Sequence, residues 1–448
     1  MLSRADAVIA RRDPALPGLA TLLDDEALLA ALRAVCPGKT IEGVEVNYAR
    51  YRPGATCLVG CQLGIGGSRV VAYARTYSPS ATSRVEKALR STGVPGPLGP
   101  GRFVLADGAT VVSIFPNDRR VMALPAIGRS EDLDTLLGEL LPTSESLRAG
   151  AALEPLVYRP EHGFVGKLVG CNGLHAVLKL YTNFTYGATP QHSEPFASRG
   201  SLRVARVIAR SDRHRAVVFE WLSGCLLSEA IHDPAFEVST MSSVGRALAE
   251  LHAQELPGLT PLTPATTSES LRATATMIGS VCPQLDASAR HLAERLGARV
   301  LDQPTVHRRL HGDFHPGQVL LDGGAVGFLD FDEGLAGDPT LDLGTFLAHL
   351  AREVIRGGLS AKHVGPLAEA LLGGYEGAIG PPVRERLPLA LAMGLFRLAP
   401  RCFRHREQDW PDRMAALLER AEESVASAPH RTSTSKTSAS QRRSHAAA

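Results

Sequence analysis

The segment 311–330 constrains the fold more than any other part of this 448-residue chain. Gly312, Pro316 and Gly317 interrupt its first part, so a continuous helix or strand is excluded and a shaped loop is expected. Two short apolar runs follow on either side of an Asp-Gly-Gly sequence, and this pattern predicts a β-hairpin centred near Gly324. The fold must therefore present an irregular loop beside the open end of a hairpin.

Three oxygen-bearing side chains are expected to converge at that open end. Gln318 and Asp330 lie opposite each other in such a hairpin, and Asp313 lies on the loop that leads into it. One carboxylate can accept or orient the proton of an attacking hydroxyl group. A second carboxylate and an amide oxygen can hold Mg²⁺ against a triphosphate. The segment therefore predicts phosphoryl transfer.

The order of these residues resembles a known family. The spacing of His311, Asp313 and Gln318, followed by a hairpin and Asp330, resembles the catalytic loop and metal-binding aspartate of protein kinases. The His-Gly-Asp sequence and the Asp-rich segment 331–343 are more similar to the aminoglycoside phosphotransferase family. The resemblance implies an α+β, protein-kinase-like fold with a small β-rich lobe and a larger helical lobe. It also implies an ATP- and Mg²⁺-dependent kinase that acts on a hydroxyl group of a small molecule.

The resemblance also implies roles for the residues of the loop and hairpin. Asp313 is expected to be the catalytic base and Asp330 the principal Mg²⁺ ligand. Gln318 stands where the family usually has Asn, so the second contact to Mg²⁺ is expected to be longer or shifted. Asp338 and Asp342 are expected to be structural, as loop and helix caps.

Two segments in the N-terminal part of the chain follow one pattern. Tyr-Arg-Pro at 51–53 begins an extended apolar segment with a Gly-rich turn at 64–67. Tyr-Arg-Pro at 158–160 begins another, with an Asn-Gly turn at 172–173. Both predict hairpins. Their likeness favours an internal duplication of a small β-rich unit, with a chance similarity of two unrelated hairpins as the alternative.

The return strand of the second hairpin carries the nucleotide-binding candidates. Val177 and Lys179 are two residues apart and therefore lie on one face of the strand. The resemblance implies that Lys179 binds the phosphates of ATP and that Val177 contacts adenine. It places the hinge at Glu220, Trp221 and Leu222, where backbone groups would bind adenine.

The first unit has Arg75 where the second has Lys179. Arginine is a poor substitute there because its guanidinium fork is bulkier than an ammonium group. The first unit also has no catalytic loop of its own. It is therefore expected to be a degenerate copy that serves as a cap or scaffold.

Two parts of a kinase site, the loop that covers the phosphates and the acidic partner of the strand lysine, depart from the usual pattern. The loop that covers the phosphates is expected near 161–163, which contains one glycine. Glu194 is the only acidic residue between Lys179 and Asp212, and it either pairs with Lys179 or is a solvated surface residue. These departures, together with Gln318, leave open a pseudokinase that binds a nucleotide or a partner without catalysis.

The expected organisation has four parts. They are an N-terminal cap at 1–150, a kinase-like small lobe at 151–226, a helical lobe with the catalytic loop at 227–426, and a disordered tail at 427–448. The local patterns predict helices at 24–34, around 198–209 and at 243–252, and a strand at 216–221. A long cap ahead of a kinase unit also resembles the layout of maltokinases.

Other classes of protein are disfavoured by composition and spacing. The net charge of +2 and the lack of a long apolar run argue against nucleic acid and membrane as partners, and a cytoplasmic location is expected. His307, His311 and His315 recur every four residues, which would suggest a metal hydrolase only on a helix that Gly312 excludes. His311 is instead expected to brace the loop backbone.

A basic cluster bears on the identity of the acceptor. It contains Arg397, Arg401, Arg404, His405 and Arg406. A pocket for a polycationic aminoglycoside should be lined with carboxylates. If the cluster faces the cleft, a neutral sugar or an anionic acceptor is favoured. If it is a solvated helix face, the acceptor remains open.

Overall fold

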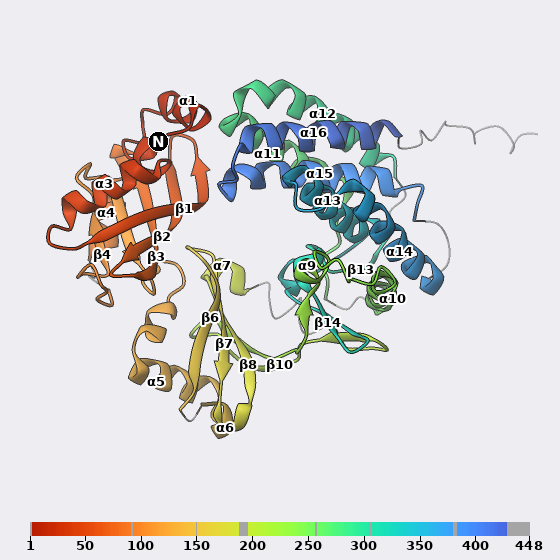
Figure 1. Ribbon diagram of the computed structural model, residues 1–448, viewed down its shortest axis with the longest axis horizontal. Coiled ribbons are helices and arrows are strands. Elements are labelled where there is room, and N and C mark those ends of the chain that lie inside the picture. Colours follow the sequence, from red (N-terminus) through yellow and green to blue (C-terminus); the bar gives the residue numbers. More distant parts are fainter. Residues whose placement is uncertain are drawn as a thin grey trace, which may run out of the picture.

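The computed structural model describes residues 2–90, 93–148, 150–187, 196–255, 258–303, 306–379 and 383–427. The described residues contain two five-stranded sheets, a four-stranded sheet, a two-stranded sheet and a group of long helices (Figure 1). The predicted α+β fold, with a β-rich lobe and a larger helical lobe, is confirmed. Glu194 and residues 428–448 of the expected tail lie outside the described residues.

The N-terminal elements form the first sheet, the helices that cover it and the segment that leads to the second sheet. They are α1 (Arg4–Arg12), α2 (Leu19–Leu22), α3 (Asp25–Val35), β1 (Ile41–Arg52), β2 (Thr56–Ile65), β3 (Ser68–Tyr77), α4 (Thr82–Leu89), β4 (Arg102–Val104), β5 (Thr110–Ile114), α5 (Ser130–Leu140) and α6 (Glu145–Arg148). Helix α3 confirms the helix predicted at 24–34, because the carboxylate of Asp24 accepts the N–H groups of Glu26 and Ala27 as an N-cap.

The second sheet carries the nucleotide-binding candidates. Its elements and the neighbouring short helix are β6 (Ala152–Arg159), β7 (Gly163–Val169), β8 (His175–Tyr181), α7 (Asn183–Tyr186), β10 (Val207–Ser211) and β11 (Ala216–Glu220). The strand predicted at 216–221 is therefore confirmed as β11.

The helix predicted around 198–209 is wrong. This segment forms β9 (Leu202–Val204) and then enters β10. Strand β9 pairs in parallel with β15 (Ala325–Phe328), and β10 pairs with β11, so both strands depend on partners distant in sequence. Val204, Val207 and Ile208 are β-branched and suit these strands better than a helix.

The two large sheets have the same strand order. The first is β1-β2-β3-β5-β4 and the second is β6-β7-β8-β11-β10. Arg75 on β3 is paired with residues of β2 and β5, and Lys179 on β8 is paired with the corresponding residues of β7 and β11. This correspondence supports the internal duplication. Each Tyr-Arg-Pro sequence, however, ends a first strand, β1 or β6, rather than beginning the second.

The helical lobe shares a core with a four-stranded sheet that contains the predicted hairpin. Its helices are α9 (Leu227–Ala230), α10 (Thr240–His252), α11 (Pro264–Val281), α12 (Asp286–Leu301), α13 (Thr340–Arg356), α14 (Ala361–Ile379), α15 (Leu387–Arg404) and α16 (Trp410–Ser427). The remaining strands are β12 (Cys225–Leu226), β13 (Arg308–Leu310), β14 (Val319–Asp322) and β16 (Leu335–Gly337). Strands β14 and β15 form the predicted hairpin, and Gly323 and Gly324 have the positive φ of its turn.

The first sheet shares its core with the helical lobe. One apolar cluster joins residues of β2, such as Val59, to residues of α15, such as Phe396. The guanidinium of Arg406 donates two hydrogen bonds to the buried carboxylate of Asp6, at 2.9 and 2.8 Å. In Figure 1, β1 lies near the ends of α15 and α16. The N-terminal unit is therefore fixed to the helical lobe by both apolar and ionic contacts.

A second core shows where the N-terminal unit meets the second sheet. Four leucines of α5 pack with apolar residues of β7, β8 and β11. Helix α5 thus covers the second sheet, although it lies within the range expected for the cap. No helix of the described residues is both long enough and apolar enough to cross a bilayer.

Candidate functional site

An ion pair joins the second sheet to the catalytic hairpin. Lys179 Nζ on β8 lies 2.7 Å from Asp330 Oδ1 and 3.4 Å from Asp332 Oδ1. The Lys179 side chain is 13% exposed, so burial acts to lower its pKa. Tyr181 and the two carboxylates outweigh that effect and raise the pKa of Lys179 above its usual value. Lys179 is therefore cationic at neutral pH and lies beside the predicted metal ligand.

Asp330 and Gln318 meet at the open end of the hairpin, as the sequence predicts. The backbone N–H of Leu329 donates to Gln318 O at 2.9 Å, and Gln318 Nε2 donates to Asp330 Oδ2 at 3.4 Å. Burial acts to raise the pKa of Asp330, but the charge and hydrogen bond of Lys179 outweigh it and lower the pKa to about 2. An ionised carboxylate beside an amide group provides the hard oxygen ligands that Mg²⁺ prefers. These residues fit that ion.

The loop before the hairpin is held by a buried carboxylate. Asp342 accepts the backbone N–H groups of His311 and Gly312 at 2.7 and 3.0 Å, and it lies 3.0 Å from His252 Nε2. Burial raises the pKa of Asp342, but hydrogen bonds from His252 and the loop lower it overall. His311 Nε2 in turn lies 2.7 Å from Leu329 O, close enough for a hydrogen bond to the hairpin backbone. Both side chains thus fix the path of the loop.

Asp338 has a different structural role. Its Oδ1 accepts the backbone N–H of Thr340 at 2.9 Å, at the start of α13. Its other oxygen accepts a hydrogen bond from Arg386, which precedes α15. Asp338 therefore links the starts of two helices.

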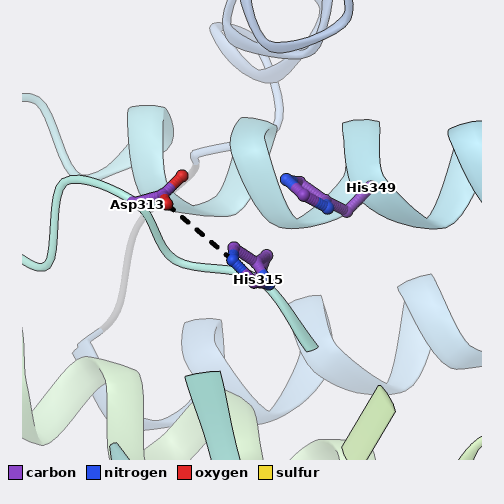
Figure 2. Close-up of side chains that lie close together, drawn as sticks. All are labelled: Asp313, His315 and His349. Atoms are coloured by element: carbon purple, nitrogen blue, oxygen red, sulfur yellow. Dashed lines mark ion pairs between the residues drawn. The ribbon is translucent and has the colours of Figure 1, made fainter. Parts of the chain in front are cut away.

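Asp313 lies between a guanidinium and an imidazole. Arg401 Nη2 on α15 donates to Asp313 Oδ1 at 3.2 Å, and His315 Nε2 lies 3.8 Å from Asp313 Oδ2. Figure 2 shows Asp313 and His315 on the loop and His349 on the neighbouring helix. The backbone N–H of Gly317 donates to His315 Nδ1 at 3.1 Å, so the neutral ring carries its proton on Nε2, towards Asp313.

Asp313, His315 and His349 also form the one group of possible metal ligands found among the described residues. Their ligand atoms lie within 4.8 Å of one another. The two imidazole rings are stacked, with centroids 4.3 Å apart. Burial lowers the pKa of both histidines, to about 4 for His315, so both are neutral at pH 7. Arg401 already donates to Asp313, and its positive charge disfavours a cation at this position.

The hinge residues connect the second sheet to the helical lobe. Glu220 ends β11, and the chain passes through Trp221 and Leu222 to β12, which pairs with β14. The Glu220 side chain binds Arg206, and the ammonium of Lys167 lies 4.9 Å from the centre of the Trp221 ring. Val177 and Lys179 lie on the less buried face of β8. Residues 220–222 therefore connect the second sheet to the helical lobe, and the nucleotide-binding roles of this segment and of Val177 and Lys179 stay predictions.

The candidate phosphate-covering loop is bound to the N-terminal unit. It joins β6 to β7, and the Glu161 side chain is only 1% exposed. Its carboxylate accepts a hydrogen bond from Arg75 and lies 3.3 Å from Arg120. Arg50 and Arg119 each lie 3.7 Å away. Arg75, which occupies the position of Lys179 in the first sheet, therefore binds a carboxylate on the loop of the second.

One acidic residue at the site was not singled out from the sequence. Asp332 contacts Lys179 and also accepts a hydrogen bond from the Tyr181 hydroxyl at 3.4 Å. Its presence in the segment after Asp330 was a usable signal, because only Phe331 separates the two aspartates in sequence. The proposed pairing of Glu194 with Lys179 lies outside the described residues.

Comparison with known proteins supports the resemblance read from the motifs. Residues 194–387 match the model of the Phosphotransferase enzyme family, APH, which confirms that resemblance over this segment. The match includes Asp313, Gln318 and Asp330 and begins after Lys179. No curated protein is similar enough in sequence to count as a match.

Several solved structures are similar to this chain at low sequence identity. A thermostable mutant of aminoglycoside phosphotransferase APH(4)-Ia, in a ternary complex with AMP-PNP and hygromycin B, is 16% identical, with a TM-score of 0.46 over 65% of this chain and 97% of its own. Choline kinase LicA from Streptococcus pneumoniae is 15% identical, with a TM-score of 0.46 over 66% of this chain and 99% of its own. Choline kinase from Cryptosporidium parvum is 9% identical, with a TM-score of 0.49 over 66% of this chain and 96% of its own.

Proposed function

We propose that this protein transfers the γ-phosphoryl group of ATP to a hydroxyl group of a small molecule. The observation that carries the proposal is the contact of Lys179 with Asp330, 2.7 Å across the two lobes. It brings together the predicted phosphate-binding cation and the predicted metal ligand, which are 151 residues apart in sequence. The family match to residues 194–387 supports the same class of reaction.

Asp313 is the proposed base. Arg401 occupies one of its oxygens, and the other is directed towards His315 rather than towards a second cation. As the hydroxyl oxygen of the acceptor bonds to the γ-phosphorus, the bond to the leaving ADP breaks with its electron pair. The hydroxyl proton passes to Asp313. His315 is a positioning residue, since its ring lies beside the Asp313 carboxylate and accepts from the loop backbone.

Lys179, Asp330 and Gln318 are proposed to hold the triphosphate. Lys179 would bind phosphate oxygens, and Asp330 with Gln318 would hold Mg²⁺, which neutralises charge on the phosphates when bound. Asp332 would keep Lys179 directed into the site. The backbone of residues 220–222 and the side chain of Val177 are proposed to bind adenine.

Thermal stabilisation by ATP with and without Mg²⁺ tests this proposal. A stabilisation that requires Mg²⁺ is expected for the wild type and should be lost in Asp330→Ala. Asp313→Asn should keep the stabilisation and lose ATP-dependent phosphorylation by roughly a thousandfold or more, as expected for a proton acceptor of the reaction. Stabilisation without turnover of any acceptor would instead favour a pseudokinase. No stabilisation under any condition would reject nucleotide binding.

A further inference from the structure

Part of the basic cluster predicted near residue 400 faces the candidate active site, whereas Arg406 of the same cluster binds Asp6. Arg397, Arg401 and Arg404 are spaced at i, i+4 and i+7 on α15, so they lie along one side of the helix. Arg401 donates to Asp313 at 3.2 Å, which places this side against the catalytic loop. Arg397 is partly buried, and its Nε has no hydrogen-bond partner among the described residues. Arg401 is therefore part of the site, and the partly buried Arg397 and Arg404 beside it on α15 do not form a solvated helix face.

Two other elements bring further guanidinium groups to the same place. Arg50 lies on β1 of the N-terminal unit, and Arg159 lies at the end of β6. The rings of Tyr48 on β1 and His405 after α15 are 6.1 Å apart, so β1 packs against the end of this helix. Burial lowers the pKa of Arg404, and the positive charges of Arg401, Arg50 and Arg159 lower it further.

The positive charges of these arginines also act on His162, which lies in the loop between β6 and β7. Burial lowers the pKa of His162, and Arg159, Arg50 and Arg404 add to that effect. The negative charge of Asp330 acts in the opposite sense on the pKa of His162. Arg50 lies 3.7 Å from Glu161, which follows Arg159 by two residues. Tyr48, on the same strand as Arg50, packs against His405, which follows Arg404. These arginines therefore gather where β1, β6 and the end of α15 meet.

The carboxylates nearby do not neutralise this group. Asp313 binds Arg401, and Glu161 is shared by Arg50 and three other arginines. Among the described residues, neither Arg159 nor Arg404 has a carboxylate partner, and the one recorded hydrogen bond of Arg404 is to Met277 Sδ at 3.8 Å. Partly buried cations that repel one another raise the free energy of the unliganded protein, and an anion bound between them lowers it.

Lys179 and the proposed metal ligands are already assigned to binding the triphosphate of ATP. Arg404 belongs instead to the helix that contacts Asp313, the proposed acceptor of the hydroxyl proton. We infer that the acceptor is an anion, a hydroxyl-bearing compound whose phosphate or carboxylate group is bound by Arg404 and Arg159 while its hydroxyl group lies at Asp313. This inference rests on the proposed function and adds the charge of the substrate to it.

Binding of matched compounds tests the inference. Glucose 6-phosphate, glucuronate, glucose and glucosamine share one hydroxylated ring and differ in charge. Their affinities are measured by calorimetry with saturating Mg²⁺·ADP, so that an anion cannot simply occupy the nucleotide phosphate site. We expect at least one of the two anions to bind about tenfold or more tightly than glucose, and glucosamine to bind most weakly.

Charge-removing variants assign the binding to α15. Arg404→Met should lower the affinity for the anion by about tenfold or more, because a charge-assisted contact is lost. Arg290→Met is the matched control, since Arg290 lies on α12 and pairs with Asp286 at the surface. Thermal stabilisation by Mg²⁺·ATP should be the same in both variants as in the wild type.

The outcomes separate this inference from the proposed function. Equal or tighter binding of glucose or glucosamine, or no binding of either anion, with Mg²⁺·ATP stabilisation intact, would overturn the anionic acceptor alone. Anion binding that Arg404→Met and Arg290→Met weaken equally would also overturn it. If Mg²⁺·ATP fails to stabilise the protein while anion binding still depends on Arg404, the proposed kinase function is refuted and the anion site remains.

Discussion

Breaking the contact between Arg75 and Glu161 should uncouple the N-terminal unit from the phosphate-covering loop. Both side chains are buried, with 7% and 1% of their surface exposed. Removing one partner of a buried ion pair typically costs about 3–5 kcal/mol, because the other charge is left without compensation. Arg120, Arg50 and Arg119 remain within 3.7 Å of Glu161 in Arg75→Met, so we expect a loss at the lower end, about 3 kcal/mol.

A double-mutant cycle measures that contact. Arg75→Met, Glu161→Gln and the double variant are compared by urea unfolding at pH 7.5, and the coupling free energy should be about 2 kcal/mol. The exposed pair Arg420–Glu423 provides the control, with a coupling of at most about 0.5 kcal/mol. The KM for ATP should rise in both single variants because the loop is no longer held. Additive single effects below about 1 kcal/mol, with an unchanged KM, would refute this account.

Two further predictions concern the loop that carries Asp313. Burial lowers the pKa of His315 to about 4, so between pH 6.5 and 4 the unfolded chain binds a proton that the folded chain does not. As the pH falls through this range, the free energy of unfolding should therefore decrease by up to about 3 kcal/mol. His315→Asn should make the decrease between pH 7.5 and pH 5.0 smaller than in the wild type. An equal decrease in both proteins would exclude His315 as the cause. Gly312 has φ +87°, and an added Cβ would lie 1.9 Å from Glu333 O. Gly312→Ala should cost about 2 kcal/mol or more and most of the activity. Gly377→Ala, inside α14 with open space around it, should keep the activity and stabilise the protein by at most about 1 kcal/mol, because alanine favours a helix.

The candidate site was predictable where local spacing decides the geometry. Gly312 and Pro316 fix the loop, the two-glycine turn fixes the hairpin, and the hairpin places Gln318 beside Asp330. Lys179 was found from its place on the return strand of a predicted hairpin and from the family resemblance. Each of these features depends on a few residues that are close in sequence, so the sequence alone predicts it.

The remaining features depend on contacts between distant segments. Segment 202–211 is a strand region because β15 and β11 provide its partners, which its own composition does not record. Glu161 looked like part of an open loop, but arginines from three segments of the N-terminal unit bury it. His349 lies on α13, far from the motif in sequence, and no local pattern joins it to His315.

The position shared by Arg75 and Lys179 has a consequence for the history of the chain. If the two sheets descend from one ancestral unit, the copy that lost its catalytic loop kept a cation at the same strand position and turned it to a new use. Replacing Arg75 by lysine would restore the ancestral residue type and at the same time withdraw the fork that binds Glu161. If the second unit needs this contact for activity, such a reversion would be selected against, and the two units would be inherited together.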